Sequence, residues 1–444
     1  MRKSLHLVSL GCNKNLVDAE VMLHKLRSYD ITQDPTKADL IIINTCAFIE
    51  GAKQESIENI LNLHSIRKPH STLLVSGCLS ERYKQSIAKL LPEVDIFTGL
   101  GDYARIDEIL ASQQSRFSEE VFLIKNEQRQ IANSLTHAFI KLSEGCNQKC
   151  SFCAIPSFRK NLHSRAPKTI LNEIKRLQKY GYHDFSLIAQ DSSSYMHDMG
   201  QKNALSKLIQ NIDKNVQNPY ERFRILYLYP SSTSLDLIRS IADAKSFAPY
   251  FDMPIQHASD AMLKIMKRGA GMKKIRPLIE AMRNIDGAWL RTAFIIGHPS
   301  EKKQDFAQII NLINEEIFDS ISVFAYSKED GTQSAKMRSI SRAIVSERMN
   351  TIEELLATKL AKTLQGFKGK KLLASIMGES EQSEHLIEAK ILDFSNEIDP
   401  TILITQSDYP LRAGDLVQAQ IKDTSPPFLL ANVVKIVRKY EEIQ

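Results

Sequence analysis

No stretch of the 444-residue sequence reaches the ~18 consecutive apolar residues of a membrane-spanning helix. The first residues, Met1 to Lys3, precede an apolar stretch that is too short for a secretory signal peptide and is interrupted by polar residues. These absences predict a cytoplasmic protein without a membrane segment.

Cysteine is also scarce, with six residues in the whole chain. Three are grouped near the middle, and the other three, Cys12, Cys46 and Cys78, are an odd number that cannot fully pair among themselves. Disulfides are therefore a poor account of these residues. Reduced thiols fit the cytosol, where they stay available to metals.

A fourth cysteine is missing from the central group. The stretch EGCNQKCSFC at residues 144–153 places Cys146, Cys150 and Cys153 in a CxxxCxxC pattern. Three thiolates can hold three corners of a 4Fe-4S cluster, whereas a cluster that only transfers electrons normally takes four. The open iron predicts a small-molecule ligand, so we expect these metal-binding cysteines to be catalytic as well. A zinc site is the alternative, but the second CxxC or histidines that it usually needs do not follow at suitable spacing.

This spacing, with Phe152 just before the last cysteine, resembles the motif of radical S-adenosylmethionine (SAM) enzymes. The resemblance implies that the amino and carboxylate groups of SAM chelate the open iron. It also implies that one electron from the cluster cleaves a carbon–sulfur bond of SAM to give a 5'-deoxyadenosyl radical.

The first hundred residues alternate short apolar runs with amphipathic stretches. Strands are expected at 4–10, 38–44 and 72–76, with helices at 15–29, 52–65 and 81–91, which predicts a parallel sheet covered by helices. Cys12, Cys46 and Cys78 each follow the end of a predicted strand, where parallel sheets bind ligands. We therefore expect them to hold a second cluster, with flanking glycines allowing close backbone approach. The alternative is that they are three compact buried side chains.

The alternation resumes in the middle of the chain. Six strands are expected there, at 137–141, 185–189, 224–229, 251–254, 289–296 and 320–326. This number fits a partial (β/α)6 TIM-like barrel, and the CxxxCxxC loop follows its first strand at the mouth of the barrel.

A long helix at 341–364 leads to short strands broken by turns, at 371–376, 386–391, 401–405, 416–421 and 430–437. A small antiparallel β-barrel is expected here. The predicted α/β protein thus has three domains, at 1–125, 132–366 and 367–438, which suits its length and its 43% hydrophobic content.

Together these parts resemble the methylthiotransferase family of radical-SAM enzymes over essentially the whole chain, the last part matching that family's TRAM domain. Three stretches resemble the branch that modifies ribosomal-protein aspartate (RimO type): VSLGCNKNLVD at 8–18, AQD at 189–191 and DMPIQHASD at 252–260. The resemblance implies methylthiolation of the β-carbon of an aspartate in small-subunit ribosomal protein twelve. SAM would serve as methyl donor and as radical source, and the cluster on Cys12, Cys46 and Cys78 would carry the methylated sulfur.

Other SAM contacts follow from position in the predicted barrel. Gln190 and Asp191 end the second strand, where a polar group could meet the SAM amino group, and Gly297 ends the fifth, where its backbone could approach adenine. Arg159 and Arg165 could donate to the SAM carboxylate, although arginines are more often at the surface.

The chain departs from the family wording at two places. GHPSE at 297–301 replaces the usual GFPGE, and Lys160 stands where a glycine commonly follows the arginine. These differences concern loop geometry, and no role is assigned to His298, because a lone loop histidine is more often solvated or hydrogen-bonded.

Charge gives a separate indication of the partner. The chain is formally +6, but residues 371–444 carry 12 acidic and 7 basic side chains, a net charge of −5. An RNA-binding tail should be basic, whereas an acidic one suits a basic ribosomal protein; an ordinary solvated acidic face is the alternative. A tRNA adenosine methylthiotransferase and a non-catalytic iron-sulfur carrier are the competing functions. We expect a monomer that takes electrons from a donor such as flavodoxin or ferredoxin.

Overall fold

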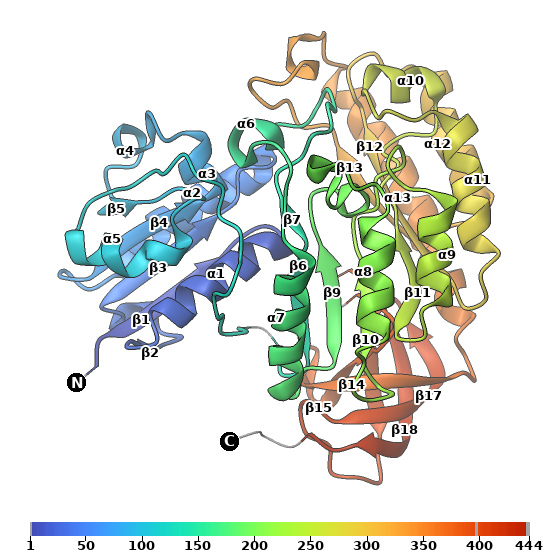
Figure 1. The fold of residues 1–444 in the computed structure, drawn as a ribbon. Helices are drawn as coiled ribbons and strands as arrows, with labels where there is room; N and C mark the ends of the chain where they lie inside the picture. Colours follow the sequence, from blue (N-terminus) through green and yellow to red (C-terminus); the bar gives the residue numbers. More distant parts are fainter. Residues whose placement is uncertain (1, 133, 396–397, 441–444) are drawn as a thin grey trace.

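The computed structural model describes residues 2–132, 134–395 and 398–440. The N-terminal part lies beside the central part, and the C-terminal barrel lies beneath the central part in this view (Figure 1). All three predicted domain ranges include residues outside the described ones, namely 1, 133, 396 and 397, and the acidic tail also includes 441–444. In the described residues, no helix has the length and apolar content needed to cross a lipid bilayer.

The N-terminal part is a five-stranded parallel sheet in the order β2-β1-β3-β4-β5. Its strands are β1 (Ser4–Ser9), β2 (Asp30–Ile31), β3 (Leu40–Thr45), β4 (Thr72–Gly77) and β5 (Ile96–Phe97). The central strand β3 is buried along its whole length, as expected for a parallel strand covered on both faces. The helices are α1 (Asn13–Lys25), α2 (Glu50–Ile66), α3 (Cys78–Arg82), α4 (Ile87–Leu90) and α5 (Ile106–Ser112). The helix predicted at 81–91 is thus two short helices separated by a turn.

The central part is a six-stranded parallel sheet in the order β6-β9-β10-β11-β12-β13, which curls into a barrel open between its first and last strands. The strands are β6 (His137–Lys141), β9 (Asp184–Ile188), β10 (Arg222–Ile225), β11 (Phe247–Asp252), β12 (Trp289–Ile296) and β13 (Ser320–Ala325). All six predicted strands are present, which confirms the partial barrel. Two differ in extent: β10 ends before the residues predicted at 226–229, and β11 begins before residue 251.

Helices cover the outer face of this sheet (Figure 1). They are α7 (Pro167–Lys179), α8 (Ala204–Asp213), α9 (Leu235–Asp243), α11 (Met272–Arg283), α12 (Lys303–Asn314) and α13 (Arg342–Gln365), while α10 (Asp260–Ile265) lies beyond the strand ends, at the top in this view. Their apolar faces pack on the sheet in one large core. A small antiparallel pair, β7 (Ser143–Glu144) and β8 (His163–Ser164), flanks the short helix α6 (Ile155–Arg159) beyond the end of β6.

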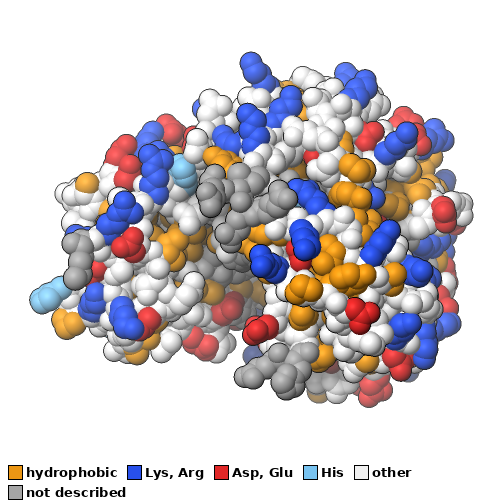
Figure 2. Space-filling model, turned by 90° about the horizontal axis from the view of Figure 1, so that it is seen from below, with side chains coloured by type: hydrophobic (Ala, Val, Ile, Leu, Met, Phe, Trp, Pro, Cys, Tyr) orange, Lys and Arg blue, Asp and Glu red, His pale blue; other side chains and the backbone are white. Residues whose placement is uncertain are grey.

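The C-terminal part is a closed barrel in the order β14-β15-β16-β18-β17. Its strands are β14 (Lys371–Ser380), β15 (Ser383–Ile391), β16 (Ile402–Gln406), β17 (Leu416–Ser425) and β18 (Phe428–Arg438). The pairing is antiparallel as predicted, except that β16 and β18 run parallel. On the face seen from below, basic and acidic side chains of the described residues are interspersed and do not gather into one acidic patch (Figure 2).

The C-terminal barrel covers the end of the central barrel at which the strands begin. Lys390 forms an ion pair with Asp184 at the start of β9, and Arg224 of β10 donates to the Leu392 carbonyl. Trp289 at the start of β12 donates to Asp399 at 3.1 Å. The opposite end, where the strands terminate, faces the N-terminal part and holds the candidate site.

Candidate active site

The structure places the first three cysteines at one rim of the N-terminal sheet. Cys12 immediately precedes α1, Cys46 directly follows β3, and Cys78 directly follows β4. β3 and β4 pair in parallel up to Thr45 and Gly77, so the two chains leave the sheet together. A Cβ atom on Gly11, which has a φ of +83°, would lie 2.5 Å from Cys46 Cβ. Glycine is therefore required for the close approach of these two segments.

Burial raises the pKa of two of these thiols and is outweighed at the third. The pKa of Cys46 rises to about 12, because the thiol is buried and lies near Cys78. Burial likewise raises the pKa of Cys78. Burial also acts on Cys12, but the positive charges of Lys14 and Arg159 outweigh it and lower the pKa of that thiol. Iron binds thiolates, so metal loading here must release protons.

The central triplet lies in the loop beyond β6, at the mouth of the barrel. The backbone N–H of Gln148 donates to Cys146 Sγ at 3.4 Å. Cys150 Sγ lies 3.3 Å from Tyr229 Oη and accepts a hydrogen bond from Arg268 Nη1 at 3.2 Å. Burial raises the pKa of Cys146 and of Cys153 to about 12. Hydrogen bonds to the sulfurs are one of the means by which proteins adjust the reduction potential of a cluster.

Both triplets fit a 4Fe-4S cluster. All six cysteines are free thiols, and within each triplet the sulfurs lie close enough for charge on one to raise the pKa of another. Among the described residues, no three His, Cys, Asp or Glu side chains form a ready site for a single metal ion. In a 4Fe-4S cluster each thiolate binds a different iron, so the three sulfurs do not have to meet at one ion.

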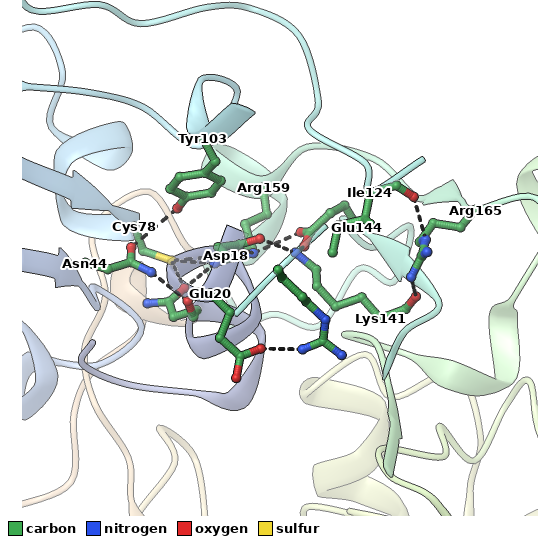
Figure 3. Close-up of polar contacts among 12 residues, drawn as sticks. Asp18, Glu20, Asn44, Cys78, Tyr103, Ile124, Lys141, Glu144, Arg159 and Arg165 are labelled. Atoms are coloured by element: carbon green, nitrogen blue, oxygen red, sulfur yellow. Dashed lines mark hydrogen bonds and ion pairs between the residues drawn. The ribbon is translucent and has the colours of Figure 1, made fainter. Parts of the chain in front are cut away.

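A buried ionic network connects the two triplets (Figure 3). Arg159, at the end of α6, donates from Nη2 to Cys78 Sγ at 3.2 Å and from Nη1 to Glu144 Oε2 at 2.9 Å. Glu144 immediately precedes the Gly145-Cys146 pair of the central triplet. Lys141 of β6 also pairs with Glu144, and it donates to Asp18 of α1 at 2.6 Å. Burial alone would raise the pKa of Glu144, but Lys141 and Arg159 hold it at about 2.

Two family models match this chain, one over each part that carries a cysteine triplet. Residues 4–99 match the uncharacterized protein family UPF0004, and residues 140–313 match the radical SAM superfamily. The chain is 48% identical over 438 residues to the ribosomal protein uS12 methylthiotransferase RimO of Sulfurovum sp. (strain NBC37-1), covering 98% of this chain and 99% of that protein. The chain belongs to the RimO family. The same protein of Campylobacter jejuni (strain RM1221) is 46% identical, with 98% and 99% of the two chains covered.

RimO membership and the radical SAM match together identify a SAM-dependent methylthiotransferase that uses 4Fe-4S clusters. Two solved structures of the radical SAM methyltransferase TsrM from Kitasatospora setae share the fold. Their TM-scores are 0.55 and 0.56 at 13% and 12% identity, and they cover 75% and 84% of this chain and 74% and 78% of their own chains. At this identity the likeness concerns the fold alone.

Of the residues expected to contact SAM in this RimO chain, Gln190 has an available acceptor. Its side-chain amide donates to Glu144 at 3.3 Å, while its Oε1 atom is buried and has no hydrogen-bond partner among the described residues. A buried acceptor without a donor is costly, and the SAM amino group is a suitable donor. Gln190 therefore remains a candidate SAM ligand.

Asp191 has a different environment. Its carboxylate accepts hydrogen bonds from Gln148 at 2.8 Å, from Ser193 at 2.7 Å and from both the backbone and the hydroxyl of Ser194, and Ser232 adds a further bond. Its acceptor capacity is therefore largely filled. In this structure it connects the central cysteine loop to the end of β9, and a direct SAM contact stays a prediction.

Gly297 directly follows β12 and has a φ of +79°. A Cβ atom there would lie 2.5 Å from Val345 of α13, so packing of this helix is one reason for glycine at this position. Approach of the Gly297 backbone to adenine also stays a prediction.

The two arginines proposed as donors to SAM are neither at the surface nor free. Arg159 is engaged by Cys78 and Glu144, and Arg165 pairs with Glu173 at 2.7 Å and donates to the Ile124 carbonyl. His298 is fully buried and hydrogen-bonds with Ser334 Oγ at 2.8 Å. Ser334 in turn donates to Ser151 of the cysteine loop, so His298 supports that loop.

Sequence reasoning missed three side chains near the cysteines: Tyr229, Arg268 and Lys14. Arg268 and Tyr229 also contact each other, with the guanidinium 4.1 Å from the ring centroid. No local motif marks Arg268, which is 118 residues beyond Cys150. The position of Tyr229 at the end of a barrel strand was the available signal, because such ends line the mouth.

Proposed function

We propose that this RimO-family protein adds a methylthio group to the β-carbon of an aspartate in small-subunit ribosomal protein uS12. Near-full-length identity to proteins named uS12 methylthiotransferases carries this proposal. The geometry supports it, because Arg159 contacts Cys78 and Glu144 at once and so joins the two segments that carry the cysteine triplets.

The two cysteine triplets have different roles in this proposal. Cys146, Cys150 and Cys153 would hold a 4Fe-4S cluster, which with bound SAM would supply radical chemistry able to remove a hydrogen atom from an unactivated carbon. Tyr229 and Arg268 contact the Cys150 sulfur and position it, while Gln190 and Asp191 would border the SAM side of the mouth. Cys12, Cys46 and Cys78 would hold the second cluster, which would supply the sulfur for the methylthio group, and Gly297 would border the adenine side.

The remaining properties belong to the same proposal. The chain works as a cytoplasmic monomer with domains at 1–125, 132–366 and 367–438, and the last is a TRAM domain. A small electron-transfer protein such as flavodoxin or ferredoxin supplies electrons. The partner is uS12, either free or within the ribosome.

The test is an anaerobic assay of the full chain reconstituted with iron and sulfide. SAM and dithionite are added with purified uS12 or with tRNA, and mass spectrometry records 5'-deoxyadenosine and any methylthio mass gain. We expect the gain on an aspartate-containing peptide of uS12. A gain on tRNA alone would assign the chain to the adenosine-modifying branch instead.

Two single variants separate the roles of the triplets. Cys150→Ala should abolish both 5'-deoxyadenosine and the methylthio product, because it removes a ligand of the radical-forming cluster. Cys78→Ala should abolish the methylthio product while SAM cleavage continues. If both variants lost SAM cleavage equally, the proposed division between the triplets would be wrong.

A further inference from the structure

Lys14, in the first turn of α1, is a buried cation without a carboxylate partner among the described residues. The residue is 7% exposed. Its ammonium donates one long hydrogen bond, 3.5 Å, to the Ala189 carbonyl and lies 4.3 Å from the centroid of the Tyr227 ring. An ammonium has three N–H donors, and burying its charge unpaired is unfavourable.

Most other buried cations are compensated, at the mouth of the barrel and elsewhere in the described residues. Lys141 pairs with Asp18 and Glu144, and Lys390 pairs with Asp184. Arg129 pairs with Glu20 and Glu173. Buried charges in proteins are normally paired in this way. Arg268 also lacks a carboxylate, but its guanidinium donates to Cys150 Sγ and to the Pro254 carbonyl. Lys14 has no comparable acceptor among the described residues and so calls for a negative partner from outside the chain.

The ammonium lies at the mouth of the barrel, close to Cys12 of the first triplet. Ala189 directly follows β9 and Tyr227 follows β10, so both contacts are at strand ends where barrel active sites form. Lys14 is two residues beyond Cys12, and its charge acts on that thiol. Tyr229, two residues beyond Tyr227 in the chain, contacts Cys150, so the segment that follows β10 borders the central triplet as well.

We infer that Lys14 is a specificity-determining residue that binds the side-chain carboxylate of the aspartate to be modified. The inference rests on the proposed function and names the group that the enzyme recognises. The carboxylate carbon is one bond from the reacting β-carbon, so a charge-assisted hydrogen bond to it would fix the reacting carbon between the triplets. The SAM carboxylate is a weaker candidate, because the family resemblance assigns it to the open iron.

The experiment is a double-mutant cycle with the reconstituted full-length enzyme. Binding of fluorescently labelled uS12 in the presence of SAM is measured anaerobically for wild type and Lys14→Met. Both enzymes are tested with natural uS12 and with uS12 whose modified aspartate, located by mass spectrometry, is changed to asparagine. Lys25→Met is the matched control, since Lys25 is an exposed lysine on the same helix.

We expect Lys14→Met to weaken binding of natural uS12 by about 10- to 100-fold, the usual strength of a hydrogen bond between charged groups. It should not weaken binding of the asparagine variant further, and Lys25→Met should bind like wild type. The modification assay should show the loss in KM more than in kcat. The melting temperature of Lys14→Met should be equal to or above that of wild type, because an unpaired buried charge has been removed; a lysine with only a structural role would lower it.

Three outcomes would overturn the inference. One is equal binding of natural uS12 by Lys14→Met and wild type. Another is an equal loss with natural and asparagine uS12. The third is loss of iron or of substrate-free SAM cleavage in parallel with loss of modification, which would assign Lys14 to a cluster or to SAM. If wild type modifies tRNA and not uS12, the proposed function itself fails; if wild type modifies uS12 and only the cycle fails, the error is in the role of Lys14.

Discussion

Arg159 Nη2 lies 3.2 Å from the sulfur of Cys78, although 81 residues separate them in the chain. The same guanidinium bonds to Glu144 at 2.9 Å, and a second ion pair to Asp18 spans 3.7 Å. One side chain therefore joins the N-terminal sheet to the loop of the central triplet, and it is buried at 5% exposure. The distance between the two cysteine groups depends on this contact.

Arg159→Met should destabilise the protein by about 3–5 kcal/mol, since it leaves Asp18 and Glu144 buried with Lys141 as their one shared cation. Urea unfolding followed by circular dichroism measures the change. Arg27→Met, at an exposed arginine just after α1, is the control and should have an effect within about 0.5 kcal/mol. A similar small effect for Arg159→Met would mean that the network does not hold the two parts together.

Two departures from the family wording should cost stability. Lys160 has φ +62° and ψ −165°, and Ser300 has φ +75°, which are backbone conformations that favour glycine. Because side chains with a Cβ are strained in such conformations, Lys160→Gly and Ser300→Gly should each stabilise the protein by about 1 kcal/mol. Thermal or urea unfolding measures the gain. The control Lys175→Gly, at an exposed position within α7, should destabilise by a similar amount; a loss of stability in all three would contradict the prediction.

Lowering the pH should decrease the free energy of unfolding through the protonation of His137 in the unfolded chain. Burial, reinforced by the nearby charge of Lys390, lowers the pKa of this histidine well below its usual value. The unfolded chain takes up a proton below pH 6.5, while the folded protein does not, so stability is full above that pH and falls as the pH decreases. At pH 5.5 one such histidine accounts for about 1.4 kcal/mol.

Urea unfolding of wild type and His137→Gln at pH 7.5 and 5.5 tests this linkage. The variant should lose about 1.4 kcal/mol less than wild type over the interval. His70→Gln, at an exposed histidine, should follow wild type. Parallel losses in His137→Gln and wild type would show that His137 is protonated in the folded state.

Much of the architecture could be predicted because it depends on local patterns. Buried parallel strands such as β3 are continuous apolar runs, and cysteines directly after them must meet at one sheet edge. The errors have local causes as well. β10 ends at Ile225 because Tyr227 adopts a φ of +64°, which the apolar sequence does not reveal. The start of β11 was missed because Pro249 lies within it and proline usually argues against a strand.

The surroundings of the cysteines could not be predicted in the same way. Arg268 reaches Cys150 from 118 residues away, and Lys14 reaches Ala189 from 175 residues away. Such contacts depend on how the parts pack, and composition alone made Arg159 and Arg165 more probable at the surface than in a buried network. Motifs identify cluster ligands; tertiary structure decides which charges face them.

The buried ionic group between the two barrels leads to a final prediction: removing its carboxylate should cost more stability than removing one of its cations. Asp184 pairs with Arg224 at 2.6 Å and also with Lys390, and all three are buried. Burial and the neighbouring Arg224 charge lower the pKa of Lys390 to about 7. Asp184→Asn leaves two buried cations without an anion and should cost about 3–5 kcal/mol, whereas Lys390→Met keeps the Asp184–Arg224 pair and should cost less than about 1.5 kcal/mol. Urea unfolding at pH 6.0, below the pKa of Lys390, ranks the two variants.

The pH dependence gives the same group a second test. Because the folded pKa of Lys390 is below that of an unfolded lysine, the unfolded state binds more protons between about pH 7 and 10.4, and stability should rise with pH over that window. Lys390→Met should lack this rise, and Lys371→Met, at an exposed lysine of the same barrel, should retain it. Two results would contradict this account. One is an equal rise of the free energy of unfolding with pH in Lys390→Met and wild type. The other is an equal loss of stability in Asp184→Asn and Lys390→Met, which would mean that the Asp184 carboxylate does not stabilise the contact between the two barrels.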